Sequence, residues 1–400
     1  MKVLVACQSA TNKGDRAIAE YLISQLLESE HEVVLSTTHP KLWESISDKI
    51  SVIGMGYKST GENAKNRFVK KFFRVFNRLV RDKILFASLI SPKSKHLICR
   101  CVSKEFVASV KRADLVIVTG GHHITSIREK NALFQFTYDI GLVSLYAKRY
   151  VLWSQTIGPL EFSSDKAKIF IENTIKNAEK VFIRDENSLS CIKSVYGSFD
   201  NLVKTYDSVF GYGDIDVRDV HEREKKVGIS IFNGLKKAFK TYDVIAQMLD
   251  MFASYGYAIE FFRMEHDDFE LENIKQVVSL MKQKADISIY PFLSETEEHL
   301  REVASCRCFI GYKTHSIIMA LTTATPLIAI AYHKKSADFM KDFGLEEYVV
   351  SDEELCVENS NRLIYKLNEN LKEIQLKEKK VAQLMAKQLK SDLSRLTSYD

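Results

Sequence analysis

The sequence predicts an α/β protein built from two Rossmann-like domains, each with a parallel sheet. Short runs rich in Val, Ile and Phe alternate with amphipathic segments of helical length, which is the pattern of βαβ units. These runs form two series, and a polar stretch over residues 214–226 separates them. A chain of 400 residues is also long enough for two or three domains.

The first series of predicted strands is expected to form an N-terminal domain over residues 1–220. Its strands begin near Lys2, Glu32, Ile50, Leu115, Tyr150, Lys180 and Leu202. The second series is expected to form a C-terminal domain over residues 221–351. Its strands are predicted over residues 226–232, 257–263, 287–292, 306–311, 326–332 and 348–350.

Two further segments complete the predicted domain organisation. Residues 214–226 contain almost no apolar side chains, so we expect a solvated linker. Residues 352–400 have helical periodicity and many Lys and Glu, which predicts one or two helices packed on the body. A coiled-coil surface for a partner is the alternative for this tail.

The composition excludes several classes of protein. There are 57 Lys and Arg against 52 Asp and Glu, a net charge of +5, which is too balanced for a dedicated nucleic-acid-binding protein. The 7 cysteines include no CxxC pair, so we expect reduced thiols and no zinc ribbon. The chain passes directly from Met1 into a short apolar strand, and no apolar stretch approaches about 18 residues. We therefore expect a cytoplasmic protein without a membrane span.

The candidate site residues are those that directly follow a predicted strand, because ligands of open α/β sheets collect at the carboxyl ends of the strands. After the first strand, Asn12-Lys13-Gly14-Asp15 leads into a helix predicted over residues 16–28. Gly14 permits a tight backbone and Asp15 is the predicted helix cap. A turn with a cap and a ligand site both fit this stretch. It is not GxGxxG, so the dinucleotide fingerprint is absent.

A pair of glycines follows the strand that begins near Leu115. Gly120-Gly121 lets a ligand approach the backbone. We therefore favour a glycine-lined wall of a binding site over a simple turn. The next two residues, His122 and His123, point in different directions along the chain. For this reason we expect no metal site there.

Cations follow three further predicted strands. Arg184 either pairs with its neighbours Asp185 and Glu186 or binds a carboxylate or phosphate with its planar guanidinium. Lys313 and His315 lie where a strand passes into a helix, and a helix N-terminus attracts anions. His333-Lys334-Lys335 follow the next strand. This predicts a concentration of positive charge suited to a substrate with carboxylate and phosphate groups. Solvated lysines and a packed histidine are the alternatives.

Taken in order, these stretches resemble the polysaccharide pyruvyl transferase family. Family members have an Asn-x-Gly-Asp loop near the start and later a strand that ends in Gly-Gly, here Asn12 to Asp15 and Gly120-Gly121. The resemblance continues through residues 155–159, 184–186, Asp207 and 311–335, and it spans roughly residues 1 to 350. Where the family usually has Arg-Leu-His, this chain has Lys313-Thr314-His315, which keeps the charge but loses the planar fork.

The resemblance implies a glycosyltransferase-B-like architecture and transfer of pyruvate from phosphoenolpyruvate to sugar hydroxyls, forming a ketal. The acceptor is expected to be a surface polysaccharide or its lipid-linked precursor, and no cofactor is implied beyond phosphoenolpyruvate as co-substrate. The alternatives are a nucleotide-sugar-dependent glycosyltransferase of the same architecture and a non-catalytic glycan-assembly protein.

The resemblance also implies roles for individual residues. His315 is expected to be the catalytic proton donor, since imidazole titrates near neutrality. Donor binding is expected from Arg184, Lys313 and Lys335, which would stabilise the departing phosphate. Acceptor binding is expected from Asn12, Asp15, Gly120 and Gly121.

A basic amphipathic stretch lies over residues 65–83. It contains eight Lys or Arg residues and one Asp, and Phe68, Phe72, Phe76 and Leu79 recur at spacings of four, four and three. This spacing predicts a helix with an apolar stripe flanked by cations. Packing of the stripe on the N-terminal domain is the favoured interpretation. Contact with the anionic inner face of a membrane is the alternative.

Overall fold

A computed structural model of the chain describes residues 1–9, 11–46, 48–57, 67–76, 87, 102–127, 135–162, 164–231, 238–332 and 334–398. The chain divides into two compact units. Unit 1 comprises Met1–Ala10 and Ile18–Ser208, and unit 2 comprises Thr11–Ala17 and Val209–Asp400. The boundary therefore lies near residue 208, and not near 220. The segment Thr11–Ala17, which the sequence assigned to the N-terminal domain, belongs to the second unit.

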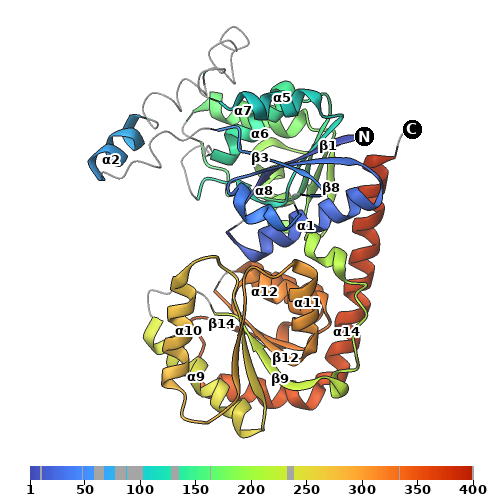
Figure 1. The fold of residues 1–400 in the computed structure, drawn as a ribbon. Helices are drawn as coiled ribbons and strands as arrows, with labels where there is room; N and C mark the ends of the chain where they lie inside the picture. The colour runs from blue at the N-terminus through green and yellow to red at the C-terminus, as the bar shows by residue number, and fades with distance from the viewer. Residues whose placement is uncertain are drawn as a thin grey trace. The chain divides into compact units, whose positions relative to one another are not determined.

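Unit 1 contains an 8-stranded sheet with the order β3-β2-β1-β4-β6-β7-β8, with β5 paired to β6 (Figure 1). All of its strand pairs are parallel. The strands are β1 (Lys2–Gln8), β2 (Glu32–Thr37), β3 (Ser51–Gly54), β4 (Leu115–Val118), β5 (Gly121–Ile124), β6 (Tyr150–Ile157), β7 (Lys180–Ile183) and β8 (Leu202–Lys204). Among the described strands of unit 1 the sequence prediction missed β5, which begins with a glycine, a residue depleted in strands.

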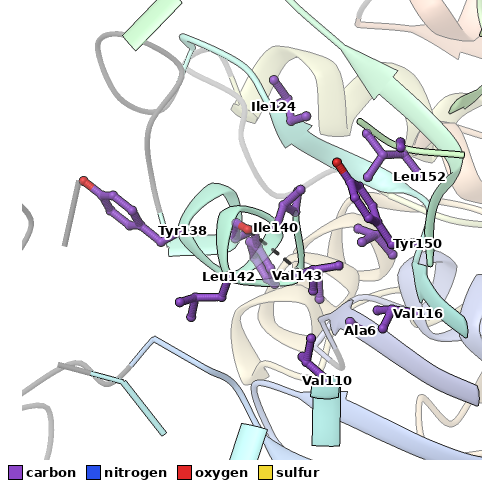
Figure 2. Packing of buried hydrophobic residues seen from close by; sticks show 14 of the residues in the cluster. Ala6, Val110, Val116, Ile124, Tyr138, Ile140, Leu142, Val143, Tyr150 and Leu152 are labelled. Atoms are coloured by element: carbon purple, nitrogen blue, oxygen red, sulfur yellow. Dashed lines mark hydrogen bonds between the residues drawn. The ribbon is translucent and has the colours of Figure 1, made fainter. Parts of the chain in front are cut away.

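The helices of unit 1 join these parallel strands. They are α1 (Lys13–Glu28, which begins in unit 2), η1 (Pro40–Ile46), α2 (Arg67–Phe76), α5 (Lys104–Arg112), α6 (Gln135–Tyr146), α7 (Asp165–Lys176), α8 (Glu186–Tyr196) and η5 (Ser208–Tyr212, which continues into unit 2). Buried side chains of α6, such as Ile140 and Val143, pack with Ala6, Val116 and Leu152 of the sheet (Figure 2). The central strands β4 and β6 are buried along their whole length rather than on alternate residues, as expected for parallel strands covered on both faces.

Unit 2 contains a 6-stranded parallel sheet with the order β11-β10-β9-β12-β13-β14. This is the Rossmann order, which reverses direction between β9 and β12. The strands are β9 (Glu224–Ile229), β10 (Ala258–Phe262), β11 (Ile287–Tyr290), β12 (Cys306–Gly311), β13 (Leu327–Ala331) and β14 (Val349–Ser351). Every strand of the second predicted series is present, so the predicted fold class is confirmed.

The helices of unit 2 are η6 (Val220–Glu222), α9 (Ala238–Ser254), α10 (Asp268–Leu280), α11 (Thr296–Ser305), α12 (Thr314–Thr322), α13 (Lys334–Asp342), η7 (Glu346–Tyr348) and α14 (Val357–Thr397). The tail is thus one helix of 41 residues, drawn red in Figure 1. Its apolar side, including Leu363, Leu367 and Leu371, is buried. This burial accounts for the periodicity of the tail without a coiled-coil partner.

The predicted solvated linker is wrong at its C-terminal end. Val220 is completely buried and Arg223 is only 3% exposed. The Arg223 guanidinium donates to the carbonyls of Thr323 and Ala324 at 3.3 and 2.9 Å, at the end of α12. A cation is favoured there because the carbonyls at a helix C-terminus carry partial negative charge. Burial nevertheless lowers the pKa of Arg223 to about 10.

A buried carboxyl group ties α6 to the chain after β3. Asp139 is completely buried and accepts hydrogen bonds from the backbone N–H groups of Gly56 at 3.0 Å and Tyr57 at 2.6 Å. A Cβ atom on Gly56 would lie 2.9 Å from Asp139 Oδ1 and 2.5 Å from the Phe106 ring, so only glycine fits. Burial raises the pKa of Asp139 to about 7, despite the two N–H donors.

This raised pKa predicts a pH-dependent contribution to stability. The folded state holds the Asp139 proton more tightly than the unfolded chain, where Asp titrates near about 4. The contribution of Asp139 to the free energy of unfolding is therefore largest below about pH 4 and decreases as pH rises to about 7. We expect the difference in unfolding free energy between wild type and Asp139→Asn to change in this direction across that window, measured by urea denaturation. A difference independent of pH would contradict the assignment.

Candidate functional site

The candidate site of unit 2 lies at the carboxyl edge of its sheet, beside the point where the strand order reverses. Lys313 and His315 follow β12, one of the two strands at this switch point. The other strand, β9, is followed by Ser230, whose hydroxyl donates to that of Ser316 in α12. Crevices at such switch points are the common ligand sites of this fold. The fold thus places Lys313 and His315 at the position where this type of sheet commonly binds a ligand.

Lys313 is held by two carboxylates in the interior of unit 2. Its side chain is 7% exposed, and its Nζ lies 3.1 Å from Glu270 Oε1 and 3.3 Å from Glu265 Oε1. Glu270 is completely buried and also accepts from the backbone N–H groups of Met264 at 2.9 Å and Glu265 at 3.0 Å. Donor binding by Lys313 stays a prediction beside these contacts. Its charge is already compensated within the protein, and its visible role is to join β12 to the end of β10.

Glu265 is the site residue that the sequence analysis missed. Its side chain is 27% exposed, and it accepts a hydrogen bond from Asn12 Nδ2 at 2.9 Å as well as facing Lys313. Burial raises the pKa of Glu265, with Glu270 acting in the same direction and Lys313 and Asn12 acting against it. The signal in the sequence was its position just after a predicted strand, at the same edge as Lys313.

The loop Asn12 to Asp15 lies against this edge of unit 2. Asn12 and Glu265 form an antiparallel bridge, and the Lys13 backbone N–H donates to Met264 at 2.9 Å. The buried Lys13 ammonium donates to the Phe292 carbonyl at 3.3 Å. These contacts anchor the loop on the unit that carries Lys313 and His315. The prediction that it lies in the N-terminal domain is therefore wrong.

Asn12, and not Asp15, caps helix α1. Asn12 Oδ1 accepts from the backbone N–H groups of Gly14 at 2.9 Å and Asp15 at 3.3 Å. The helix consequently begins at Lys13, three residues before the predicted start, and Asp15 lies in its first turn. The short amide side chain is a good cap because its oxygen reaches the first free N–H groups. The Asn12 side chain thus uses its oxygen for the helix and its nitrogen for Glu265.

Gly14 makes room for His315. A Cβ atom at residue 14 would lie 1.9 Å from Cγ and 2.1 Å from Nδ1 of the His315 ring, a distance that no side chain allows. His315 is half-buried and occupies the second position of α12. The Asn12 to Asp15 loop and His315, which the sequence analysis treated as separate motifs, therefore lie in direct contact.

The starts of α12 and α13 lie next to each other. Thr314 Oγ1 and Ser336 Oγ are 3.2 Å apart, which joins the first residue of α12 to the third residue of α13. Lys335, beside Ser336, is half-buried. Two helix N-termini thus meet at one edge, where their dipoles favour anions. His333 lies outside the described residues, as does the side chain of Lys334.

Arg184 lies in unit 1, after β7. Its Nη1 pairs with the buried Asp207, and its Nε donates to Thr156 Oγ1 at 2.9 Å. The alternative pairing with Asp185 or Glu186 is therefore replaced by a pairing with Asp207. Asp185 instead caps α8, accepting from the Ser188 N–H at 2.8 Å. Burial acts to raise the pKa of Asp185, but these hydrogen bonds hold it below its ordinary value.

Packing explains both glycines of the Gly120-Gly121 pair. A Cβ atom on Gly120 would lie 2.9 Å from the Ser154 carbonyl oxygen, and one on Gly121 would lie 2.3 Å from the His123 ring. Gly121 also has a φ of 159°. The space next to these glycines is therefore filled by the protein itself, and an acceptor role for them stays a prediction. His122 and His123 contact the carbonyls of Gly158 and Gly120, and no group of potential metal ligands occurs among the described residues.

The Lys313–Glu270 pair predicts a strong energetic coupling. Glu270→Gln keeps an acceptor for the backbone but leaves the Lys313 ammonium with less compensation, so we expect a loss of about 3–5 kcal/mol in the free energy of unfolding. Adding Lys313→Met should recover most of this loss, as measured by urea denaturation. The exposed pair Arg301–Glu297 is the control, with an expected loss of about 1 kcal/mol or less. Equal losses at the two pairs would show that Lys313 does not depend on Glu270.

Comparisons with solved structures agree with the fold. A putative UDP-N-acetylglucosamine 2-epimerase from Listeria monocytogenes superimposes with a TM-score of 0.61 at 9% identity, covering 100% of this chain and 97% of that chain. A glycosyltransferase from Rickettsia africae gives 0.54 at 11% identity, covering 100% and 99%. The UDP-GlcNAc 2-epimerase from Methanocaldococcus jannaschii gives 0.55 at 8% identity, covering 91% and 92%. At these identities the likeness shows the two-domain glycosyltransferase-B-type fold alone.

The sequence comparisons identify the family. No curated protein matches the chain. The profile of the family described as polysaccharide pyruvyl transferase matches residues 12–334, which is most of the chain and includes the Asn12 loop, Arg184, Lys313 and His315. On this match the chain belongs to the polysaccharide pyruvyl transferase family and is a transferase.

Proposed function

We propose that this transferase moves pyruvate from phosphoenolpyruvate onto two hydroxyls of a sugar, in a surface polysaccharide or its lipid-linked precursor. The reaction would take place in the cytoplasm and need no cofactor. The observation that carries the proposal is the His315 ring resting against Gly14 at the carboxyl edge of the unit 2 sheet. It joins two motifs of the family that lie 300 residues apart in the sequence.

The chemistry sets the requirements for the site. A proton added to the methylene carbon of phosphoenolpyruvate gives a methyl group and a cationic centre at C2. One sugar hydroxyl attacks C2, the C2–O bond to phosphate breaks, and the second hydroxyl then closes the ketal. Of the two hydroxyl protons released, one restores the proton donor and the other leaves with inorganic phosphate. The enzyme must therefore supply one proton donor and hold a carboxylate and a departing phosphate.

The position of His315 supports its proposed role as proton donor. The residue is half-buried at the start of α12. Its ring occupies the space that a side chain at residue 14 would fill. Imidazole is the side chain that most readily gives and regains a proton near neutral pH. Glu265 and Asn12 lie on the same edge, so His315 has polar neighbours for a hydroxyl-bearing acceptor. We therefore keep His315 as the proposed general acid.

The donor anion would be bound mainly at the paired starts of α12 and α13. The Thr314–Ser336 contact supports this interpretation, since it brings two helix dipoles together beside Lys335. Lys335 stays in the proposal as a donor-binding residue. Donor binding by Arg184, which lies in unit 1, stays a separate prediction. Lys313, whose ammonium faces Glu270 and Glu265, also stays a proposed donor-binding residue. It would position the His315 end of α12 relative to the Asn12 loop.

Acceptor-dependent release of phosphate from phosphoenolpyruvate tests the proposal. We expect wild type to release phosphate and to leave a pyruvate ketal on a surface glycan, detected by mass spectrometry. His315→Ala should reduce the rate by about 10²–10⁴-fold, because it removes the proton donor, while the fold is retained by circular dichroism. Near-full activity of His315→Ala would remove this residue from the mechanism.

The solved neighbours favour one second candidate, a nucleotide-sugar-dependent glycosyltransferase, because a glycosyltransferase is among them. In that case the helix starts would hold a diphosphate. Thermal-shift titration separates the two candidates. Saturable stabilisation by a sugar nucleotide, with none from phosphoenolpyruvate, would contradict pyruvyl transfer.

Gly14→Ala provides an independent test of the His315 arrangement. The added methyl group would collide with the His315 ring, so either the ring or the loop must move. We expect a loss of at least about 10²-fold in phosphate release, since small displacements of catalytic groups are costly. Gly54→Ala is the matched control, because a Cβ atom there meets nothing within 4 Å. If both variants keep wild-type rates, the Gly14–His315 contact has no role in catalysis.

A further inference from the structure

The sequence of helix α2, labelled in Figure 1, puts its cationic and apolar positions on different sides of the helix. Its ten residues, RFVKKFFRVF, contain Arg67, Lys70, Lys71 and Arg74 and no acidic residue. At about 100° per residue, the four cations fall within an arc of about 100°. The six apolar residues fall within an arc of about 160° on the other side of the helix.

The apolar side chains of α2 that the structure describes are exposed to solvent. Phe68 is 83% exposed, Phe72 is 66% exposed and Val75 is 47% exposed. These three residues are spaced by four and three, so they share one face of the helix. The favoured prediction that the stripe packs on the N-terminal domain is therefore wrong for Phe68 and Phe72, while the Phe76 side chain and Leu79 lie outside the described residues. Clustered exposure of large apolar residues marks a surface that interacts with something else.

We infer that α2 binds the surface of an anionic phospholipid bilayer, with its phenylalanines in the boundary between headgroups and acyl chains. The helix has both properties that such binding needs, an apolar face and a flanking row of cations complementary to anionic headgroups. With ten residues it is about 15 Å long, which suits a helix lying in the plane of the surface. None of the described helices has the length and apolar character to cross a bilayer.

The charge of α2 argues against a second copy of the chain as the occupant. Two apposed α2 helices would bring eight cations together with no acidic residue on either one. A nucleic acid could bind the cations through its phosphates, but the phenylalanines would stay exposed to water. An anionic bilayer would bind the cations through its headgroups and accommodate the phenylalanines among its acyl chains.

Vesicle co-sedimentation of the full chain tests this inference. We expect binding to phosphatidylcholine vesicles that contain phosphatidylglycerol to be at least about tenfold tighter than binding to pure phosphatidylcholine, and to weaken as salt is added. Phe68→Ser with Phe72→Ser should weaken it at least about tenfold. Lys71→Gln with Arg74→Gln should remove the preference for the anionic lipid. Exposed leucines of α14 supply the matched control, Leu376→Ser with Leu384→Ser, which should bind like wild type.

Several outcomes would overturn the inference. These are no binding of wild type to the anionic vesicles, unchanged binding of the Phe68 and Phe72 variant, and equal loss in the α14 control. Self-association that the Phe68 and Phe72 variant abolishes, without vesicle binding by wild type, would assign the face to a second copy instead. The inference does not rest on pyruvyl transfer. Vesicle binding is measured without substrates, so its failure is distinguishable from failure of the phosphate-release assay.

Discussion

The candidate site of unit 2 depends on one buried ion pair, between Lys313 and Glu270. Glu270 is completely buried, and its carboxylate accepts from the backbone after β10 while it faces the Lys313 ammonium at 3.1 Å. A charge buried in this way is tolerated only when it is paired and hydrogen-bonded. The pair therefore fixes the end of β12 against the end of β10. Because Lys313 directly precedes α12, this contact also fixes the start of that helix, where His315 lies.

The Asn12 loop is the second support of the same edge. Its backbone pairs with Glu265, Lys13 reaches the turn after β11, and Gly14 leaves space for the His315 ring. Asn12, Lys13 and Gly14 thus each have a definite structural role. The motif therefore restricts the position of the His315 ring, because the ring packs directly against Gly14.

The substitution of Lys for the family's usual Arg at residue 313 has a physical interpretation in this setting. A planar guanidinium suits bidentate binding of a donor carboxylate, whereas an ammonium is a point charge that two converging carboxylates can enclose. Glu265 and Glu270 enclose it here. The paired starts of α12 and α13 lie next along the chain, joined by the Thr314–Ser336 contact.

The sequence by itself determined the strands, their parallel pairing into two Rossmann-like sheets, and the strand ends that carry Lys313, His315 and Arg184. These features follow from local periodicity and from the handedness rules of βαβ units, which are readable along the chain. Only the tertiary structure decided which groups meet: Glu270 with Lys313, Asp207 with Arg184, and Gly14 with His315. It also placed Thr11–Ala17 in unit 2 and left the α2 phenylalanines exposed. Contacts between residues far apart in sequence depend on how whole elements pack, and no local pattern encodes them.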